Sequence, residues 1–238
     1  MKRKFIPARF VIAVIVLVGV GWMGWQLLLA RTGPAVRLLP AMVHQRLAAH
    51  GGVYVPLSEI PAMLRQAVVA TEDASFWTNP GIDPKGIARS LLVDIATASF
   101  QQGGSTITQQ LARDMLLNPR KTLWRKAKEM LLALVITRYY SKDTILEMYL
   151  NEIYLGHGAY GVGQAARVYF GEPPQFLTPA QCVMLAGLPR GPSLYDPLEN
   201  LQAARERQRE VLDNMVDAGY LSPEQADRIY AQPLGLSR

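Results

Sequence analysis

Residues 10–30 form the longest uncharged run in this chain of 238 residues. The run contains 21 residues, mostly apolar. At a rise of about 1.5 Å per residue, a helix of this length spans roughly the 30 Å hydrocarbon core of a bilayer. The run therefore predicts a transmembrane helix. A cleaved signal peptide is the alternative, but its apolar region has about 7 to 15 residues and ends at a small-residue cleavage site.

From residue 57 onward, apolar residues recur mostly at helical spacing, and strand patterns are scarce. Leu64 and Val68, for example, are four positions apart and so share one face of a helix. Ser141 and Ser222 match the residue that caps the start of a helix. The chain is thus predicted to be mainly α, with helices over 60–70, 84–98, 106–117, 123–140, 142–151, 163–169, 179–188, 198–218 and 223–230.

Glycine and proline mark the expected interruptions between these elements. Gly33 and Pro34 predict a break after the apolar run, and the four glycines within residues 156–163 predict a loop that continues to Gly163. On this basis the chain divides into a tail over 1–9, the transmembrane helix over 10–30, a membrane-proximal linker over 31–52 and one helical domain over 53–238.

The net charge of +6 is concentrated at the N-terminus. Five of the 25 basic residues flank the apolar run: Lys2, Arg3, Lys4, Arg9 and Arg31. No acidic residue precedes Glu59. The other 20 oppose 19 acidic residues, so a broad basic surface for nucleic acid is not expected. Because four of the five precede the run, the positive-inside rule predicts a cytoplasmic N-terminus and a domain outside the plasma (inner) membrane.

Cysteine and histidine usage narrows the chemistry further. Cys182 is the single cysteine, which excludes a disulfide scaffold and cysteine-based zinc sites within one chain. It stands in an apolar helical pattern, so a buried thiol is expected. His44, His50 and His157 lack the spacing of metal ligands, and the sequence offers no Ser-His-Asp arrangement. A metal-dependent hydrolase or a serine hydrolase is therefore poorly supported.

The first stretch with candidate chemistry is the acidic pair Glu72 and Asp73. The pair directly follows the apolar end of a predicted helix, at Val68 and Val69. A carboxyl group at the edge of an apolar surface is suited to act as a general acid or base. The alternative is a solvated acidic cap at the end of the helix.

The second stretch runs over residues 103–111 and places glycines, hydroxyls and amides at the start of a helix. Free backbone N–H groups there, together with the helix dipole, favour an anion such as a phosphate. The stretch lacks the Gly-Lys-Ser/Thr ending of a P-loop. An ordinary loop with a Ser or Thr cap is the alternative.

The third stretch holds five basic residues over 120–128, followed by Glu129. On a helix, Lys121, Arg125 and Glu129 fall at i, i+4 and i+8 and share a face, with Lys128 beside them. This arrangement would form a cationic cradle for a diphosphate, with one carboxylate within it. The alternative is an amphipathic surface helix in which the pair of Arg125 and Glu129 adds roughly a few tenths of a kcal/mol.

Taken in order, these stretches resemble the peptidoglycan glycosyltransferase family, which occurs as monofunctional enzymes and as the N-terminal module of class A penicillin-binding proteins. The resemblance covers residues 53–232 and includes the segments 145–151, 169–171 and 185–189. It implies a largely α, lysozyme-like domain that polymerises lipid II into glycan strands. It also implies contacts with the growing glycan chain, the membrane and penicillin-binding transpeptidases, and none with nucleic acid.

The resemblance also assigns roles to individual residues. Glu72 would be the general base that takes the proton from the 4-hydroxyl of the acceptor GlcNAc. Glu129 would assist the departure of undecaprenyl diphosphate, with Mg²⁺ as a possible bridge on the diphosphate and no organic cofactor. The implied substrate-binding residues are Asp73, Phe76, Gly103, Gly104, Ser105, Thr106, Gln109, Gln110, Arg113, Lys121, Arg125 and Lys128.

Four positions depart from the family pattern. Asn79 stands where His is usual, Thr137 and Gln181 where Glu is usual, and Lys121 where Arg is usual. Neither central carboxylate is replaced, so an active enzyme is predicted. A non-catalytic scaffold that binds lipid II is the first alternative. A lytic glycan hydrolase is the second, although a hydrolase has no anionic leaving group for the basic stretch to hold.

Overall fold

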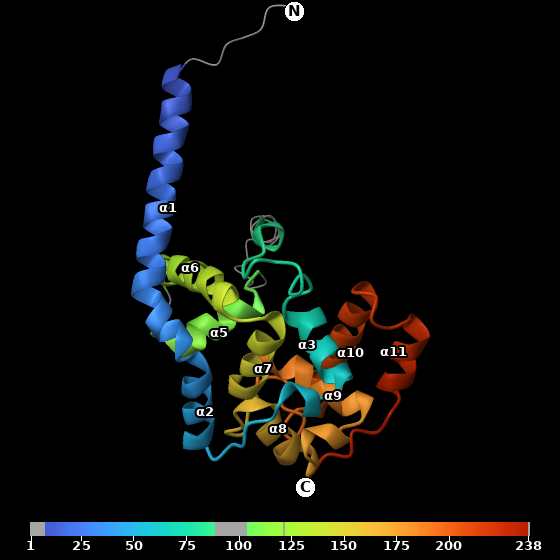
Figure 1. Cartoon of the computed structure of the whole chain (residues 1–238). Coiled ribbons are helices and arrows are strands. Elements are labelled where there is room, and N and C mark those ends of the chain that lie inside the picture. Colours follow the sequence, from blue (N-terminus) through green and yellow to red (C-terminus); the bar gives the residue numbers. More distant parts are fainter. Residues whose placement is uncertain (1–7, 89–103, 121, 238) are drawn as a thin grey trace, which may run out of the picture.

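The computed structural model describes residues 8–88, 104–120 and 122–237, and these are mainly helical (Figure 1). They contain no strand; the nearest feature is an isolated antiparallel bridge between Tyr154 and Tyr160. The predicted mainly α class is therefore confirmed. The elements are α1 (Ala8–Arg37), α2 (Leu39–Ala49), η1 (Leu57–Glu59), α3 (Ala62–Glu72), α5 (Ile107–Leu116), α6 (Leu123–Tyr139), α7 (Lys142–Glu152), α8 (Gly161–Phe170), η2 (Pro174–Phe176), α9 (Pro179–Gly187), η3 (Leu188–Arg190), α10 (Leu201–Asp217) and α11 (Pro223–Tyr230).

Helix α1 extends away from the other helices, and its C-terminal part packs against α6 (Figure 1). Gly33 marks this contact, since a Cβ atom added there would lie 2.6 Å from the Tyr139 hydroxyl oxygen. The break predicted at Gly33 and Pro34 is wrong, because the glycine serves a close approach between helices and α1 continues to Arg37. Throughout the described residues, no helix has both the length and the apolar character that crossing a membrane requires.

Helix α2 belongs to the helical domain, although the sequence predicts a linker there. Its buried residues Leu39, Val43 and Leu47 recur every four positions and form one apolar face. Helix α2 packs against α7 and α5, and Leu39 and Val43 of this face join the main hydrophobic core. Because three side chains of α2 lose their exposure to water in this packing, the helix adds to the stability of the domain.

The other helices form two groups. In the first group, α3, α9 and α10 pack on one another and α11 packs against α10. In the second group, α5 packs against α6 and α7. Helix α8 contacts both α7 and α9, so it connects the two groups. One continuous cluster of buried apolar side chains runs through both, and its largest members include Tyr149 and Tyr169.

The two helix starts predicted from capping residues, at Ser141 and Ser222, are confirmed. The Ser141 side chain accepts a hydrogen bond from the backbone N–H of Thr144 at the start of α7, and Ser222 forms a capping box at the start of α11. The helix expected over 84–98 is helical at 84–88, and its other residues lie outside the described part of the chain.

The glycine-rich loop ends earlier than predicted. Gly156 and Gly158 have φ values of 95° and 72°, which favour glycine in a loop. Helix α8 then begins at Gly161, so Gly163 lies inside a helix. A Cβ atom at Gly163 would lie 2.8 Å from Val55 Cγ2, so this glycine permits close packing of α8 on the segment before η1.

Candidate active site

A cleft of about 790 Å³ lies between the two helix groups. Five arginines and two acidic residues line it, so its wall carries a net positive charge. Such a wall favours an anionic ligand, for example a diphosphate. The charged lining residues are Arg46 of α2, Arg113 and Asp114 of α5, Arg125 of α6, Arg190 of η3, Arg207 of α10 and Glu72 of α3.

A second cleft of about 440 Å³ adjoins the first, since Thr71, Glu72 and Ser105 line both. The charged residues in its described lining are all acidic: Glu72, Asp73, Asp83 and Asp217. Glu72 therefore stands where a cationic cleft meets a cleft of the opposite charge. This position lets one carboxylate face two ligands at once.

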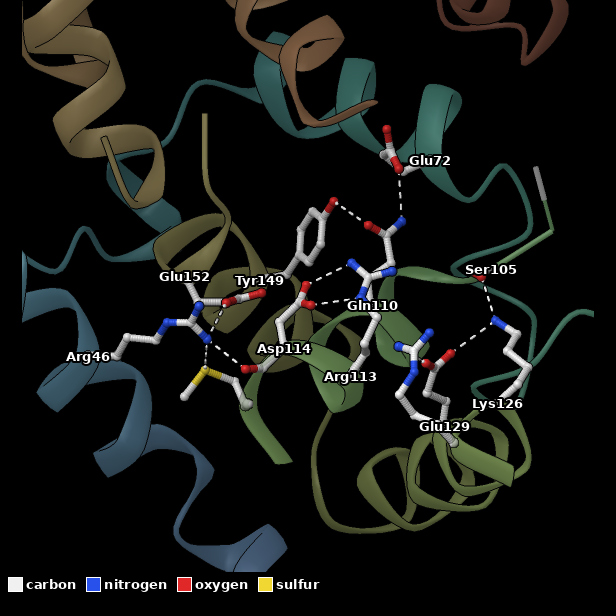
Figure 2. Close-up of polar contacts among 12 residues, drawn as sticks. Arg46, Glu72, Ser105, Gln110, Arg113, Asp114, Lys126, Glu129, Tyr149 and Glu152 are labelled. Atoms are coloured by element: carbon white, nitrogen blue, oxygen red, sulfur yellow. Dashed lines mark hydrogen bonds and ion pairs between the residues drawn. The ribbon is translucent and has the colours of Figure 1, made fainter. Parts of the chain in front are cut away.

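Glu72 is the last residue of α3, and its side chain points toward α5 (Figure 2). Gln110 Nε2 donates a hydrogen bond to Glu72 Oε2 at 2.8 Å. The Tyr149 hydroxyl in turn donates to Gln110 Oε1 at 3.3 Å. The preceding turn of α3 is anchored by the buried side chains of Val68 and Val69. The helix thus fixes where the carboxylate lies, and the amide fixes one of its oxygens.

Asp73 is buried next to Glu72, with 6% of its surface exposed. Its carboxylate accepts hydrogen bonds from Asn79 Nδ2 at 2.9 Å, Ser75 Oγ at 3.1 Å and the backbone N–H of Ile107 at 3.2 Å. Burial raises the pKa of Asp73, although these hydrogen bonds oppose the rise. Asp73 thus ties the end of α3 to the start of α5.

Asn79 occupies the position where the resemblance expects His. Its Nδ2 donates to Asp73, and its Oδ1 accepts from the backbone N–H of Gly81 at 2.9 Å and from Lys142 Nζ at 3.0 Å. Burial lowers the pKa of Lys142, and the nearby Asp73 charge opposes this effect. The asparagine therefore uses both ends of its amide to hold the turn after α3.

Glu129 lies on α6 and is only 2% exposed. Arg125 Nη1 is 2.6 Å from Glu129 Oε1, and Lys126 Nζ is 3.1 Å from Glu129 Oε2. Lys126 Nζ also donates to Ser105 Oγ at 2.6 Å (Figure 2). Arg125 and Glu129 therefore share a helix face, as their spacing predicts. The carboxylate is buried between two cations, in contrast to a pair on a solvated surface.

Arg46 connects α2 to the wall of the larger cleft. Its Nη1 donates to the backbone oxygen of Asp114 at 2.6 Å and lies 3.5 Å from Glu152 Oε2 (Figure 2). The Asp114 carboxylate accepts hydrogen bonds of 2.7 and 2.8 Å from Arg113. Glu152 is 2% exposed, and burial, followed by the charge of Asp114, raises its pKa to about 8.

Most of the predicted substrate-binding residues line one of the two clefts: Asp73, Gly104, Ser105, Thr106, Gln110, Arg113 and Arg125. Three others are absent from the lining of both clefts. Phe76 is fully buried in the core, Gln109 closes a capping box with Thr106, and Lys128 Nζ lies 5.7 Å from the centre of the Trp124 ring. The remaining two, Gly103 and Lys121, lie outside the described residues.

Three arginines of this site are not predicted from the sequence: Arg46, Arg190 and Arg207. Lys126 lies in the predicted basic stretch, but its contact with Glu129 is not predicted. Lys126 precedes Glu129 by three positions, so helical spacing contains the signal for their contact. Arg46 lies in the segment expected to be a linker. Arg190 and Arg207 are far from Glu72 in sequence, and the packing of α9 and α10 on α3 brings them to the same cleft.

Two further departures from the family pattern lie outside the lining of both clefts. The Thr137 hydroxyl donates to the backbone oxygen of Ala133 at 2.9 Å within α6. Gln181 Oε1 accepts from the backbone N–H of Thr178, and its Nε2 donates to the backbone oxygen of Leu234, each at 2.8 Å. A glutamate at 181 would keep the first bond and lose the second, because an ionised carboxylate cannot donate.

The residues that line the larger cleft do not form a site that would hold Mg²⁺ through protein ligands alone. Across the described parts of the chain, no three His, Cys, Asp or Glu side chains gather where they could hold a metal. Of the two carboxylates in the cleft wall, that of Asp114 is already paired with Arg113 through two hydrogen bonds. Glu72 would supply a single carboxylate, so the other oxygens of a six-coordinate Mg²⁺ ion would have to come from waters and a bound diphosphate.

The chain is similar to several known proteins. Penicillin-binding protein 1A of Escherichia coli is 47% identical over 174 residues, which are 73% of this chain and 20% of that protein. A candidate transglycosylase of Cupriavidus necator is 44% identical over 202 residues, which are 85% of this chain and 87% of that protein. The crystal structure of penicillin-binding protein 1A from Haemophilus influenzae aligns with a TM-score of 0.47 and 26% identity, over 78% of this chain and 18% of that one.

The chain thus spans about a fifth of the length of the E. coli relative and most of the C. necator relative. A family model described as Transglycosylase matches residues 41–216, which contain Glu72, Glu129 and every charged residue named in the larger cleft. Since this match covers most of the chain, the protein belongs to the transglycosylase family.

Proposed function

We propose that this protein is a peptidoglycan glycosyltransferase, which polymerises lipid II into β-1,4 glycan strands and releases undecaprenyl diphosphate. One observation carries the proposal: the Glu72 carboxylate stands at the junction of a cationic cleft and a second cleft. A glycosyl transfer needs such an arrangement, because a base must reach the acceptor hydroxyl while cations hold the diphosphate of the donor. Membership of the transglycosylase family supports the same reaction.

In this mechanism the donor diphosphate lies in the larger cleft. Arg113 and Arg125 would contact its phosphate oxygens, and Lys126 would add a third positive charge from its position between Ser105 and Glu129. As the bond between C1 of MurNAc and the diphosphate oxygen breaks, negative charge grows on that oxygen. Fixed cations stabilise this charge without reorganisation, which lowers the barrier.

The acceptor approaches Glu72 from the side of the smaller cleft. Glu72 takes the proton of the GlcNAc 4-hydroxyl as the hydroxyl oxygen attacks C1 of the donor. The attack comes from the face opposite to the leaving diphosphate, so the configuration at C1 inverts. The proton ends on Glu72, and the electron pair of the broken bond ends on the diphosphate.

Glu129 has a positioning role in this scheme. Its two oxygens hold Arg125 and Lys126, and the carboxylate itself is almost inaccessible to a ligand. Removing the negative charge would leave two cations to repel each other at the cleft wall. The pattern of contacts therefore favours Glu129 as the residue that gathers the cations for the diphosphate. Mg²⁺ bound to the diphosphate itself is a further proposal, and no step above depends on it.

We further propose that residues 10–30 anchor the enzyme in the plasma (inner) membrane, with the catalytic domain outside. The support is the run of 21 uncharged residues and the four basic residues before it. Such an anchor would keep the enzyme on the surface that holds its lipid-linked substrate and its penicillin-binding transpeptidase partners. A C-terminal reporter that works only in the cytoplasm should stay silent, and an active reporter would contradict the proposed orientation.

The test of the reaction is Glu72→Gln, which keeps the shape of the side chain and removes its basicity. General base catalysis contributes about 10² to 10⁴ in rate, so the variant should polymerise labelled lipid II at least about a hundredfold more slowly while it still binds lipid II. The products are resolved on a gel, and circular dichroism checks the fold. A wild-type protein that binds lipid II and never polymerises it would favour the scaffold alternative. Full activity of Glu72→Gln would refute the proposed role of the carboxylate.

A further inference from the structure

We propose that Tyr149 is a positioning residue for Glu72, and that it acts by holding the Gln110 amide with its nitrogen toward the carboxylate. The inference rests on the general base role proposed for Glu72. The three residues come from different helices, since Glu72 ends α3, Gln110 lies on α5 and Tyr149 lies on α7 (Figure 2). We call them the base relay.

Within the described part of the chain, the Tyr149 hydroxyl hydrogen-bonds to the site through Gln110. Its side chain is fully buried and is absent from the lining of both clefts. The hydroxyl donates to Gln110 Oε1 at 3.3 Å, and Gln110 Nε2 donates to Glu72 Oε2 at 2.8 Å (Figure 2). The amide is therefore the hydrogen-bonded path by which a substitution at Tyr149 reaches Glu72.

The orientation of the amide matters because its two ends have nearly the same shape and opposite hydrogen-bonding character. If the amide were reversed, the Gln110 oxygen would face the Glu72 carboxylate, and the nitrogen would donate to the Tyr149 oxygen. The hydroxyl hydrogen of Tyr149 would then lose Gln110 Oε1, its acceptor in the described structure. A buried donor without an acceptor is unfavourable, so Tyr149 selects the orientation that is seen.

The hydroxyl keeps its proton over the whole range in which a carboxylate titrates. Burial raises the pKa of Tyr149 well above its ordinary value. The charges that face the hydroxyl come from Glu72 on α3, Arg113 and Asp114 on α5 and Glu152 on α7; the three acidic groups add to the rise and Arg113 opposes it. The two donor bonds in series therefore stay in place over this range and keep the Gln110 N–H directed at the Glu72 carboxylate.

The experiment is the pH profile of kcat/KM for lipid II polymerisation by the full chain in detergent. In Tyr149→Phe, the acidic limb should move to higher pH by about half a unit to one unit, since one buried hydrogen bond that favours the ionised form is lost. The KM and the rate on the alkaline side should stay close to wild type. Tyr169→Phe is the matched control: Tyr169 is also fully buried, and its hydroxyl donates to the Leu155 backbone oxygen at 2.9 Å, outside the base relay. Its profile should not move.

A second background isolates the relay. Gln110→Met removes the amide, so adding Tyr149→Phe should cause no further shift. Three results would each overturn the inference. The acidic limb of the pH profile could stay in place in Tyr149→Phe, it could shift equally when Tyr149→Phe is added to Gln110→Met, or it could shift by a similar amount in Tyr169→Phe.

If Tyr149→Phe does not fold, the test uses 3-fluorotyrosine at position 149. This side chain is a stronger hydrogen-bond donor, so the acidic limb of the pH profile should move to lower pH. An acidic limb that does not move, or that moves to higher pH, overturns the inference.

If the wild type polymerises no lipid II at any pH, the proposed function fails. The relay is then tested by carbon NMR titration of the Glu72 carboxyl, whose midpoint should be higher in Tyr149→Phe. An unchanged midpoint overturns the relay.

Discussion

Replacing Glu152 by Gln should make the protein increasingly more stable than the wild type as the pH rises. Glu152 is 2% exposed and its Oε1 has no hydrogen-bond partner among the described residues. Burial raises its pKa to about 8 from an ordinary value of 4.5, the charge of Asp114 adds to the rise, and Arg46 and Arg113 oppose it. Near neutral pH the folded protein therefore holds a proton on this carboxyl, and Gln resembles that protonated form.

The direction of this pH dependence follows from whether the folded and the unfolded protein keep the Glu152 proton. Between about pH 5 and 8 the unfolded chain has released the Glu152 proton and the folded chain has kept it. The contribution of this raised pKa to stability is fully present below the unfolded pKa and is lost as the pH rises through the folded pKa. The slope is at most about 1.4 kcal/mol per pH unit. The ion pair to Arg46 opposes this loss. We therefore expect the free energy of unfolding of Glu152→Gln, relative to that of the wild type, to grow by about 2 to 4 kcal/mol from pH 5 to 8.

The assay is denaturant unfolding of the full chain in detergent at several pH values between 5 and 9. Glu206→Gln, at an exposed carboxyl on α10, is the control and should give a difference that does not change with pH. If the difference in unfolding free energy between Glu152→Gln and wild type does not change with pH, the reasoning is refuted, because the carboxyl would then titrate alike in the folded and unfolded states. A variant that loses stability relative to wild type with rising pH would mean that the pair with Arg46 outweighs burial.

Two further predictions concern individual contacts. Lys126→Ala should slow lipid II polymerisation about tenfold or more, because the cation that Ser105 and Glu129 hold beside the cleft is lost. Lys128→Ala removes a lysine of the same helix whose ammonium lies over the Trp124 ring, and it should stay within about twofold. Equal effects in the gel assay would contradict the assignment. Gln181→Glu should lower the free energy of unfolding by about 1 to 3 kcal/mol, because the bond to the Leu234 oxygen is lost; unchanged denaturant unfolding would show that this bond contributes nothing.

The sequence already contains the local features of the fold. Helices α6, α9 and α11 begin at the residues that the pattern predicts, since capping side chains and prolines act within one turn. Glu72 and Glu129 stand out as candidates because a carboxyl after an apolar helix and a carboxyl one turn beyond Arg125 are short-range patterns, although a solvated cap and a surface ion pair give the same patterns. The family resemblance supplies their proposed roles.

Local patterns mislead where a residue serves a distant contact. Gly33 reads as a break, yet it permits the approach of Tyr139, more than a hundred positions later. Gly163 reads as part of a loop, yet it lies in α8 and makes room for Val55. A glycine has the same signature in both cases, since the absence of a Cβ atom permits either a turn or close packing.

By itself, the sequence determined the mainly α class, most helix boundaries and the two central carboxylates, because each depends on neighbours within a few turns. Tertiary structure decided which cations share a cleft with Glu72 and how deeply Glu129 and Glu152 are buried. It also set the orientation of the Gln110 amide. These properties depend on distances and exposure created when α2, α3, α5, α7 and α10 pack together. Charge interactions depend strongly on such burial, so the chemistry of this site emerges only in the folded chain.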